Sequence, residues 1–288
     1  MELKADHLSG TRLLNLDTEV EGDFLVSCSG GSNIDLSFDI EREANSSKAY
    51  KLSISGLKGG HSGVEIDKQR ANAIKLAARL LYLVKADVRL ASFVGGIKHN
   101  AVPANAEVVF ATDKFDSLKE GLDALVADLK EEYRVEDPGL TISFTEVTAD
   151  QVYTKDLSDS VIDMIMALPD GVQYMSKDIE GLVQTSLNNS VLLENDGKLV
   201  LTTSVRSASS SSLREILNRV TIIANRMGAV AREYSSYPAW QYEAVSPLRD
   251  IAEKIYVEMY GKEPNITSIH AGLECGLLKG ILPNTDMI

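Results

Sequence analysis

The chain has 288 residues and a formal charge of −13, and 44% of its residues are hydrophobic. This length allows one large domain or two ordinary ones, and the acidic balance argues against nucleic acids and anionic membranes as partners. No run of about 18 apolar residues is present to span a membrane, and Met1 to Asp6 lack the apolar core of a signal peptide. Two cysteines, Cys28 and Cys275, are too few for a disulfide framework, so we predict a cytoplasmic protein.

Strand and helix patterns alternate between residues 50 and 144. Tyr50, Leu52 and Ile54 alternate with polar residues, as in a half-buried strand. The elements expected after this strand are a helix over 66–84, strands over 88–94 and 106–111, a helix over 118–129 and a strand over 140–144. The order β-α-β-β-α-β is that of the ferredoxin-like fold.

The second half repeats this pattern without repeating the residues. It contains a helix around 161–166, paired strands over 181–193 and 198–206, a helical stripe over 213–227 and a closing strand over 230–234. Asp196-Gly197 lies between the paired strands and is typical of a hairpin turn. We therefore predict an α+β protein with two ferredoxin-like units.

The last part of the chain has a different pattern. Ser246 and Pro247 begin a predicted helix that ends before Gly261. Its expected buried face consists of Leu248, Ile251, Ile255 and Met259. A strand over 264–269 then leads into a His-Ala-Gly-Leu-Glu-Cys-Gly turn at 270–276.

Three separated motifs carry the functional information. They are Asn-Leu-Asp-Thr-Glu at 15–19, Gly-Gly-His-Ser-Gly at 59–63 and the turn at 270–276. In identity and order they resemble the aminoacyl-histidine dipeptidases, a branch of the co-catalytic zinc amidohydrolase and aminoacylase clan, over nearly the whole chain. The resemblance implies an enlarged lid domain over 31–236, with both ferredoxin-like units in one sheet. Residues 1–30 and 237–288 are then stubs of an α/β zinc-peptidase catalytic domain.

Two residues are candidates for the chemistry itself. His61 lies in a glycine-rich loop whose backbone can approach a ligand closely, although such a loop can also be a plain strand-to-helix turn. The resemblance implies that His61 polarises the scissile carbonyl when the lid closes. It also makes Asp17 a metal ligand of the complete enzyme; an ordinary turn aspartate is the alternative.

Three further residues are candidates for binding substrate. Strand parity places Arg206 on the more polar face of its strand, where a guanidinium can clamp a carboxylate or form a surface salt bridge. The resemblance implies that Arg206 holds the C-terminal carboxylate of a dipeptide. It further implies substrate contacts by Asn100, in an Asn-Ala-Val-Pro segment, and by the backbone at Gly272.

The metal site of the family has few counterparts here. Its His-x-Asp pair and final histidine have none, and the only Glu-Glu pair, Glu131-Glu132, ends a charged helical run. We therefore expect a fragment, inactive alone, of an enzyme that hydrolyses Xaa-His dipeptides with two zinc ions. Two alternatives stay open: a non-catalytic binding or dimerisation module that forms a homodimer, and a related amidohydrolase that acts on N-acyl amino acids.

Overall fold

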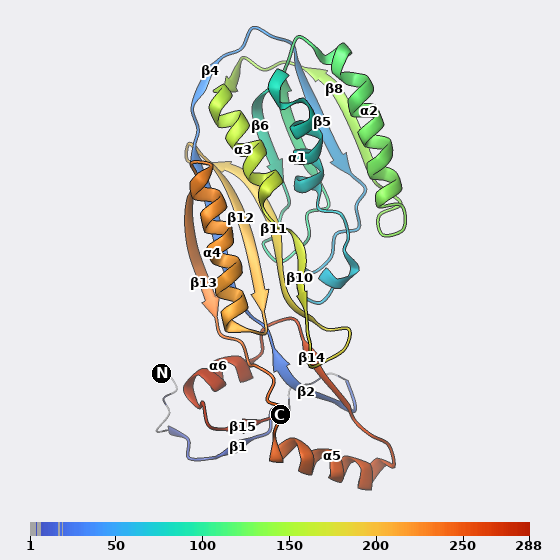
Figure 1. The fold of residues 1–288 in the computed structure, drawn as a ribbon, viewed down its shortest axis with the longest axis vertical. Coiled ribbons are helices and arrows are strands. Elements are labelled where there is room, and N and C mark those ends of the chain that lie inside the picture. The colour runs from blue at the N-terminus through green and yellow to red at the C-terminus, as the bar shows by residue number, and fades with distance from the viewer. Residues whose placement is uncertain (1–3, 5–6, 17, 19) are drawn as a thin grey trace.

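The computed structural model describes residues 4, 7–16, 18 and 20–288, and it confirms the α+β fold. Its centre is a nine-stranded sheet in the order β13-β3-β12-β11-β6-β7-β5-β8, with β10 beside β11 (Figure 1). The strands of this sheet are β3 (Gly30–Asp39), β5 (Ala49–Ser55), β6 (Arg89–Gly95), β7 (Ala106–Ala111), β8 (Thr141–Val147), β10 (Gly171–Met175), β11 (Val183–Asn195), β12 (Lys198–Ser207) and β13 (Val230–Tyr237). All of their pairings are antiparallel.

The first ferredoxin-like unit is the predicted one. It runs β5-α1-β6-β7-α2-β8, with α1 at Ala73–Val84 and α2 at Phe115–Glu132. The expected start of α1 at residue 66 is wrong. Ile66–Lys68 form a separate 3-10 turn, and Gln69 follows it with a left-handed φ of 48°. The helix begins only after Asn72, whose side chain accepts hydrogen bonds from the Ile74 and Lys75 backbone N–H groups.

The second unit takes its first strand from an earlier part of the chain. Its sheet order, β13-β3-β12-β11, is that of a ferredoxin-like unit in which β3 is the first strand. Its helices are α3 (Lys155–Ala167) and α4 (Ser210–Arg226). The first unit is thus inserted between β3 and α3. A two-stranded ribbon of β4 (Arg42–Ala44) and β9 (Gln151–Tyr153) lies where the chain enters and leaves the insertion.

Strands β6 and β11 join the two units into one sheet. Leu192 on β11 lies opposite Gly95 on β6. Gly96, which follows β6, has a φ of 68°, and a Cβ there would lie 1.9 Å from the Ser190 carbonyl oxygen. Only glycine allows so close an approach of the two backbones.

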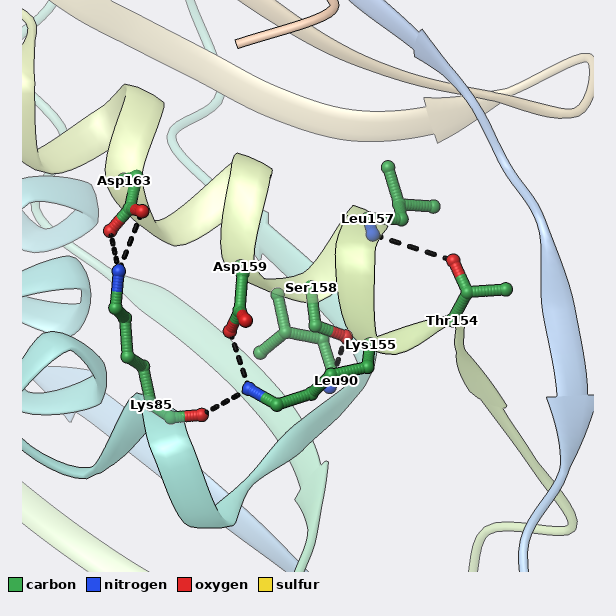
Figure 2. A network of polar contacts seen from close by, with 8 residues as sticks. All are labelled: Lys85, Leu90, Thr154, Lys155, Leu157, Ser158, Asp159 and Asp163. Atoms are coloured by element: carbon green, nitrogen blue, oxygen red, sulfur yellow. Dashed lines mark hydrogen bonds and ion pairs between the residues drawn. The ribbon is translucent and has the colours of Figure 1, made fainter.

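Polar contacts fasten α3 of the second unit to the first unit (Figure 2). The Lys155 ammonium donates to the Lys85 carbonyl at 2.6 Å, and Lys85 in turn contacts Asp163 at 2.6 Å. The Leu90 backbone N–H donates to the Ser158 hydroxyl at 3.0 Å in the interior. Helix α3 therefore joins the second unit to the first unit by side-chain contacts, in addition to the pairing within the sheet.

The four large helices cover one face of the sheet and share a single hydrophobic core with it. Strand β12 shows how the faces differ. Leu199, Leu201 and Val205 belong to the core, whereas Ser204 and Arg206 lie on the opposite face, as strand parity predicts. Polar groups for a binding site are thus available on the face without helices.

Both ends of the chain meet in a smaller part at one end of the molecule (Figure 1). Its two parallel strand pairs are β1 (Arg12–Leu13) with β15 (Asp286–Met287) and β2 (Asp23–Cys28) with β14 (Asn265–Ile269). Its helices are α5 (Pro247–Tyr260) and α6 (Glu274–Ile281). Among the described residues, no helix has the length and apolarity needed to cross a bilayer.

Helix α5 has the predicted ends but not the predicted buried face. Ser246 caps it, and Gly261 follows it in the left-handed conformation. Leu248 is buried as expected, but Ile251, Ile255 and Met259 are exposed. The helix instead buries Arg249 and Tyr256, and the Tyr256 ring packs edge-on against Phe24. Periodicity identifies an apolar face but does not say whether another element covers it.

Candidate functional site

The His61 loop fixes the orientation and tautomer of its imidazole. The Nδ1 atom of His61 accepts hydrogen bonds from the Gly63 and Val64 backbone N–H groups at 3.1 and 3.2 Å. A nitrogen that accepts from two donors carries no proton, so the ring N–H is at Nε2. Burial and then the Arg206 guanidinium lower the pKa of His61. The ring is therefore a neutral donor at neutral pH.

Arg206 lies beside this loop without an acidic partner. Its Nη1 donates to the Tyr237 hydroxyl at 3.0 Å, and its Nε is buried with no hydrogen-bond partner. Within the described residues it forms no ion pair. A half-buried guanidinium without a carboxylate is suited to bind an anionic group from outside the chain.

Asn100 lies on a loop that pairs with the His61 loop. The Asn100 carbonyl accepts from the Ser62 backbone N–H at 2.9 Å, and Ala101 forms an isolated bridge with His61. Asn188 on β11 donates its side-chain N–H to the Ala101 carbonyl at 2.8 Å. The second unit therefore holds the loops of the first unit from which His61 and Asn100 project.

Gly272 packs against Tyr237, which contacts Arg206, and so lies in the same region as His61 and Arg206. A Cβ on Gly272 would lie 2.8 Å from the Tyr237 ring, and Tyr237 in turn contacts Arg206. Glycine is required for this close packing. The structure thus gathers His61, Asn100, Arg206 and Gly272 from four distant segments into one region. Their functional roles remain predictions.

Sequence reasoning missed His270 and Ser186. His270 is 6% exposed, and its Nε2 lies 2.7 Å from the Ser186 hydroxyl. Ser186 is the partner of Arg206 in the β11–β12 ladder, so the two side chains share the face without helices. The sequence signal was the histidine that opens the turn at 270–276. Nothing in the sequence pairs it with a serine 84 residues earlier.

The described residues give little support to the predicted metal site. Asp17 lies outside the described residues. In the part of the chain that the structure describes, no three His, Cys, Asp or Glu side chains come together as a metal site. Cys28 and Cys275 are free and buried, and burial raises the pKa of both thiols. The described residues do not by themselves fit a two-zinc centre.

We expect His270 to make the protein less stable in mild acid. Burial, followed by Arg206 and His61, lowers its pKa from the usual 6.5 to about 4. Between these two values the unfolded chain binds a proton that the folded chain does not. Stability is therefore complete above pH 6.5 and falls as the pH drops, by about 3 kcal/mol at pH 4.

Urea unfolding at a series of pH values measures this loss. In His270→Gln the difference in unfolding free energy between pH 7 and pH 4 should shrink by about 3 kcal/mol. The same difference in the variant and the wild type would show that His270 does not titrate in this way.

Comparison with known proteins agrees with the fold and with the family resemblance expected from the sequence. Residues 52–137 match the family model of the peptidase dimerisation domain. The chain is also 34% identical over 293 residues to the cytosol non-specific dipeptidase of Escherichia coli, covering 99% of this chain and 60% of that protein.

A solved structure extends the similarity to three dimensions. The aminoacylhistidine dipeptidase of Vibrio alginolyticus superposes with a TM-score of 0.94 at 36% identity, over 99% of this chain and 60% of that one. The chain is therefore similar in sequence and in fold to this aminoacylhistidine dipeptidase. It spans about three fifths of the length of these relatives.

Proposed function

We propose that this chain is the substrate-recognition part of a dipeptidase. The observation that carries the proposal is the convergence of a neutral His61 donor and an Arg206 without a carboxylate partner. A dipeptide offers one oxygen to each: its peptide carbonyl to the imidazole N–H, and its terminal carboxylate to the guanidinium. The names of the two relatives support the same substrate class.

Each residue has a defined role in this proposal. Arg206 binds the terminal carboxylate through parallel N–H donors. His61 donates its Nε2–H to the scissile carbonyl, where it stabilises the negative charge that develops on oxygen. Asn100 and the backbone at Gly272 orient the substrate. The division into a lid over 31–236 and catalytic parts over 1–30 and 237–288 belongs to the same proposal.

Zinc is the proposed cofactor, and Asp17 the proposed ligand within this chain. The described residues do not provide the rest of a two-metal site, so we assign no step of the reaction to a metal held here. By the same reasoning, hydrolysis of Xaa-His dipeptides is proposed for the complete enzyme, in the cytoplasm, and not for these residues alone.

A chimera tests the proposal. The matched three fifths of the Escherichia coli dipeptidase are replaced by this chain, and hydrolysis of glycyl-histidine, β-alanyl-histidine and N-acetyl-histidine is measured with zinc. We expect turnover of the dipeptides and its loss in the His61→Ala chimera. A folded chimera that cleaves only N-acetyl-histidine would favour the amidohydrolase instead. If the isolated chain hydrolysed these dipeptides with about two zinc ions bound per molecule, the conclusion that its metal site is incomplete would be wrong.

The alternative of a dimerisation module rests on two observations. Residues 52–137 match the peptidase dimerisation domain, and α5 exposes Ile251, Ile255 and Met259 in a row. Exposed apolar patches favour association. Sedimentation at increasing concentration gives the oligomeric state, and calorimetric titration with glycyl-histidine measures binding. A homodimer that binds no dipeptide supports the dimerisation module, whereas a monomer that binds glycyl-histidine supports substrate recognition.

A further inference from the structure

His270 has an unused hydrogen-bonding atom in the interior. Its Nε2 contacts the Ser186 hydroxyl at 2.7 Å, but its Nδ1 is buried and has no partner among the described residues. A buried polar atom without a partner costs about 1–3 kcal/mol. Such atoms are rare in native structures and each needs an explanation.

The surroundings of His270 are positively charged. Arg206 acts electrostatically on both His270 and His61, so the three side chains lie within reach of one another. Among the described residues, Arg206 and His61 are the charged or titratable groups that, besides burial, lower the pKa of His270. A cluster of one guanidinium and two neutral imidazoles is therefore suited to an anion.

His270 also borders an opening. A cleft of about 180 Å³ lies between the His61 loop, the start of β11 and the end of β14. Its lining includes Gly63, Val183, Ser268 and His270, and the carboxylate on its wall, Asp67, is exposed. The cleft therefore reaches the His270 residue, although Arg206 does not line it and the His270 Nδ1 atom is itself buried.

We propose that His270 is a second carboxylate-binding residue, which donates Nδ1–H to the anionic group held by Arg206, with Ser186 as the positioning residue. The Ser186 hydroxyl can donate to Nε2, which leaves the proton of the neutral ring on Nδ1. The ligand class is the free terminal carboxylate of a dipeptide. This inference rests on the proposed function, because it assigns a second donor to the same substrate group.

Calorimetric titration of the 288-residue chain with glycyl-histidine and with glycyl-histidinamide tests the proposal. The wild type should prefer the free carboxylate, and His270→Gln should lose about tenfold of that preference, the effect of one hydrogen bond to a charged group. Glutamine keeps a polar atom near Ser186 but places no donor at the Nδ1 position. Asparagine places an N–H donor at the Nδ1 position but no polar atom near Ser186, so His270→Asn should keep most of the preference. A purely structural role would make glutamine the better tolerated variant.

Two further measurements separate the possible failures. Ser186→Ala should weaken the preference a few-fold, whereas Ser190→Ala, which removes a hydroxyl bonded to the Thr202 carbonyl at 2.8 Å, should not. In the wild type, the ¹⁵N resonance of His270 Nδ1 should shift on addition of glycyl-histidine. No preference for the carboxylate in the wild type would overturn the proposed function and this inference together. If the wild type prefers the carboxylate, but both His270 variants keep that preference and the Nδ1 resonance does not shift, the inference alone would be overturned.

Discussion

Arg206→Lys is expected to weaken binding of glycyl-histidine about 30-fold. A lysine keeps the charge but cannot form two parallel hydrogen bonds to a carboxylate, and losing a desolvated contact of this kind costs about 2 kcal/mol or more. Lysine also lacks the planar group that Tyr237 orients through its hydroxyl at 3.0 Å. Calorimetric titration of the chain measures the dissociation constant directly.

The control for this prediction is Arg232→Lys. Arg232 is exposed on the edge strand β13, so the same chemical change there should leave affinity unaltered. The amide of the dipeptide supplies a second control, because Arg206→Lys should affect it far less than the free acid. Equal affinity of wild type and Arg206→Lys for glycyl-histidine would show that Arg206 does not bind the carboxylate. The lack of an acidic partner for Arg206 would then need another explanation.

The sequence predicted local order well, because hydrophobic periodicity reports on single elements. The alternation around Arg206 placed it on the correct face of β12, since one residue of shift would have moved Leu199 and Leu201 out of the core. The Asp196-Gly197 turn was equally predictable, because both residues adopt positive φ values. Each of these features depends on neighbours within a few residues.

Relations between distant segments were not predictable in this way. Strand β3 alternates Ile34, Leu36 and Phe38 in the core, but nothing local shows that it pairs with β12 and β13 across the inserted unit. The contact of His270 with Ser186 depends on the same long-range assembly. The glycine-rich motif identified His61, and strand parity with the family resemblance identified Arg206, each without reference to the other. Only the joining of two units in one sheet shows that they lie together.

That joining depends on a buried polar network, and Asp170→Ala should destabilise the protein by about 4 kcal/mol. Asp170 Oδ1 accepts from the Asn189 backbone N–H and side chain, both at 2.9 Å, and from the Asn72 side chain at 3.1 Å. Alanine would leave three buried donors unpaired, at about 1–3 kcal/mol each before relaxation. Urea unfolding at pH 7 measures the loss.

Asp170→Asn should cost much less than Asp170→Ala. Burial raises the pKa of Asp170, although its hydrogen bonds and the nearby Lys75 oppose this. Asparagine keeps one oxygen acceptor and removes the charge that burial disfavours. As a control, Asp128→Ala on the exposed surface of α2 should change stability by at most about 0.5 kcal/mol. Equal stability of the alanine and asparagine variants would show that the network does not depend on the acceptor at residue 170.

The network also links stability to the site. Asn72 caps α1 after the 3-10 turn that follows the His61 loop, and Asn189 follows Asn188, which donates to the Ala101 carbonyl. Asp170 thus ties the segment that carries His61 to the strand next to Arg206. If the two units are held in register by this contact, Asp170→Ala should lose the preference for glycyl-histidine over its amide at temperatures where most of the chain is still folded. Retained preference in the folded variant would mean that the β6–β11 junction alone positions the two halves of the site.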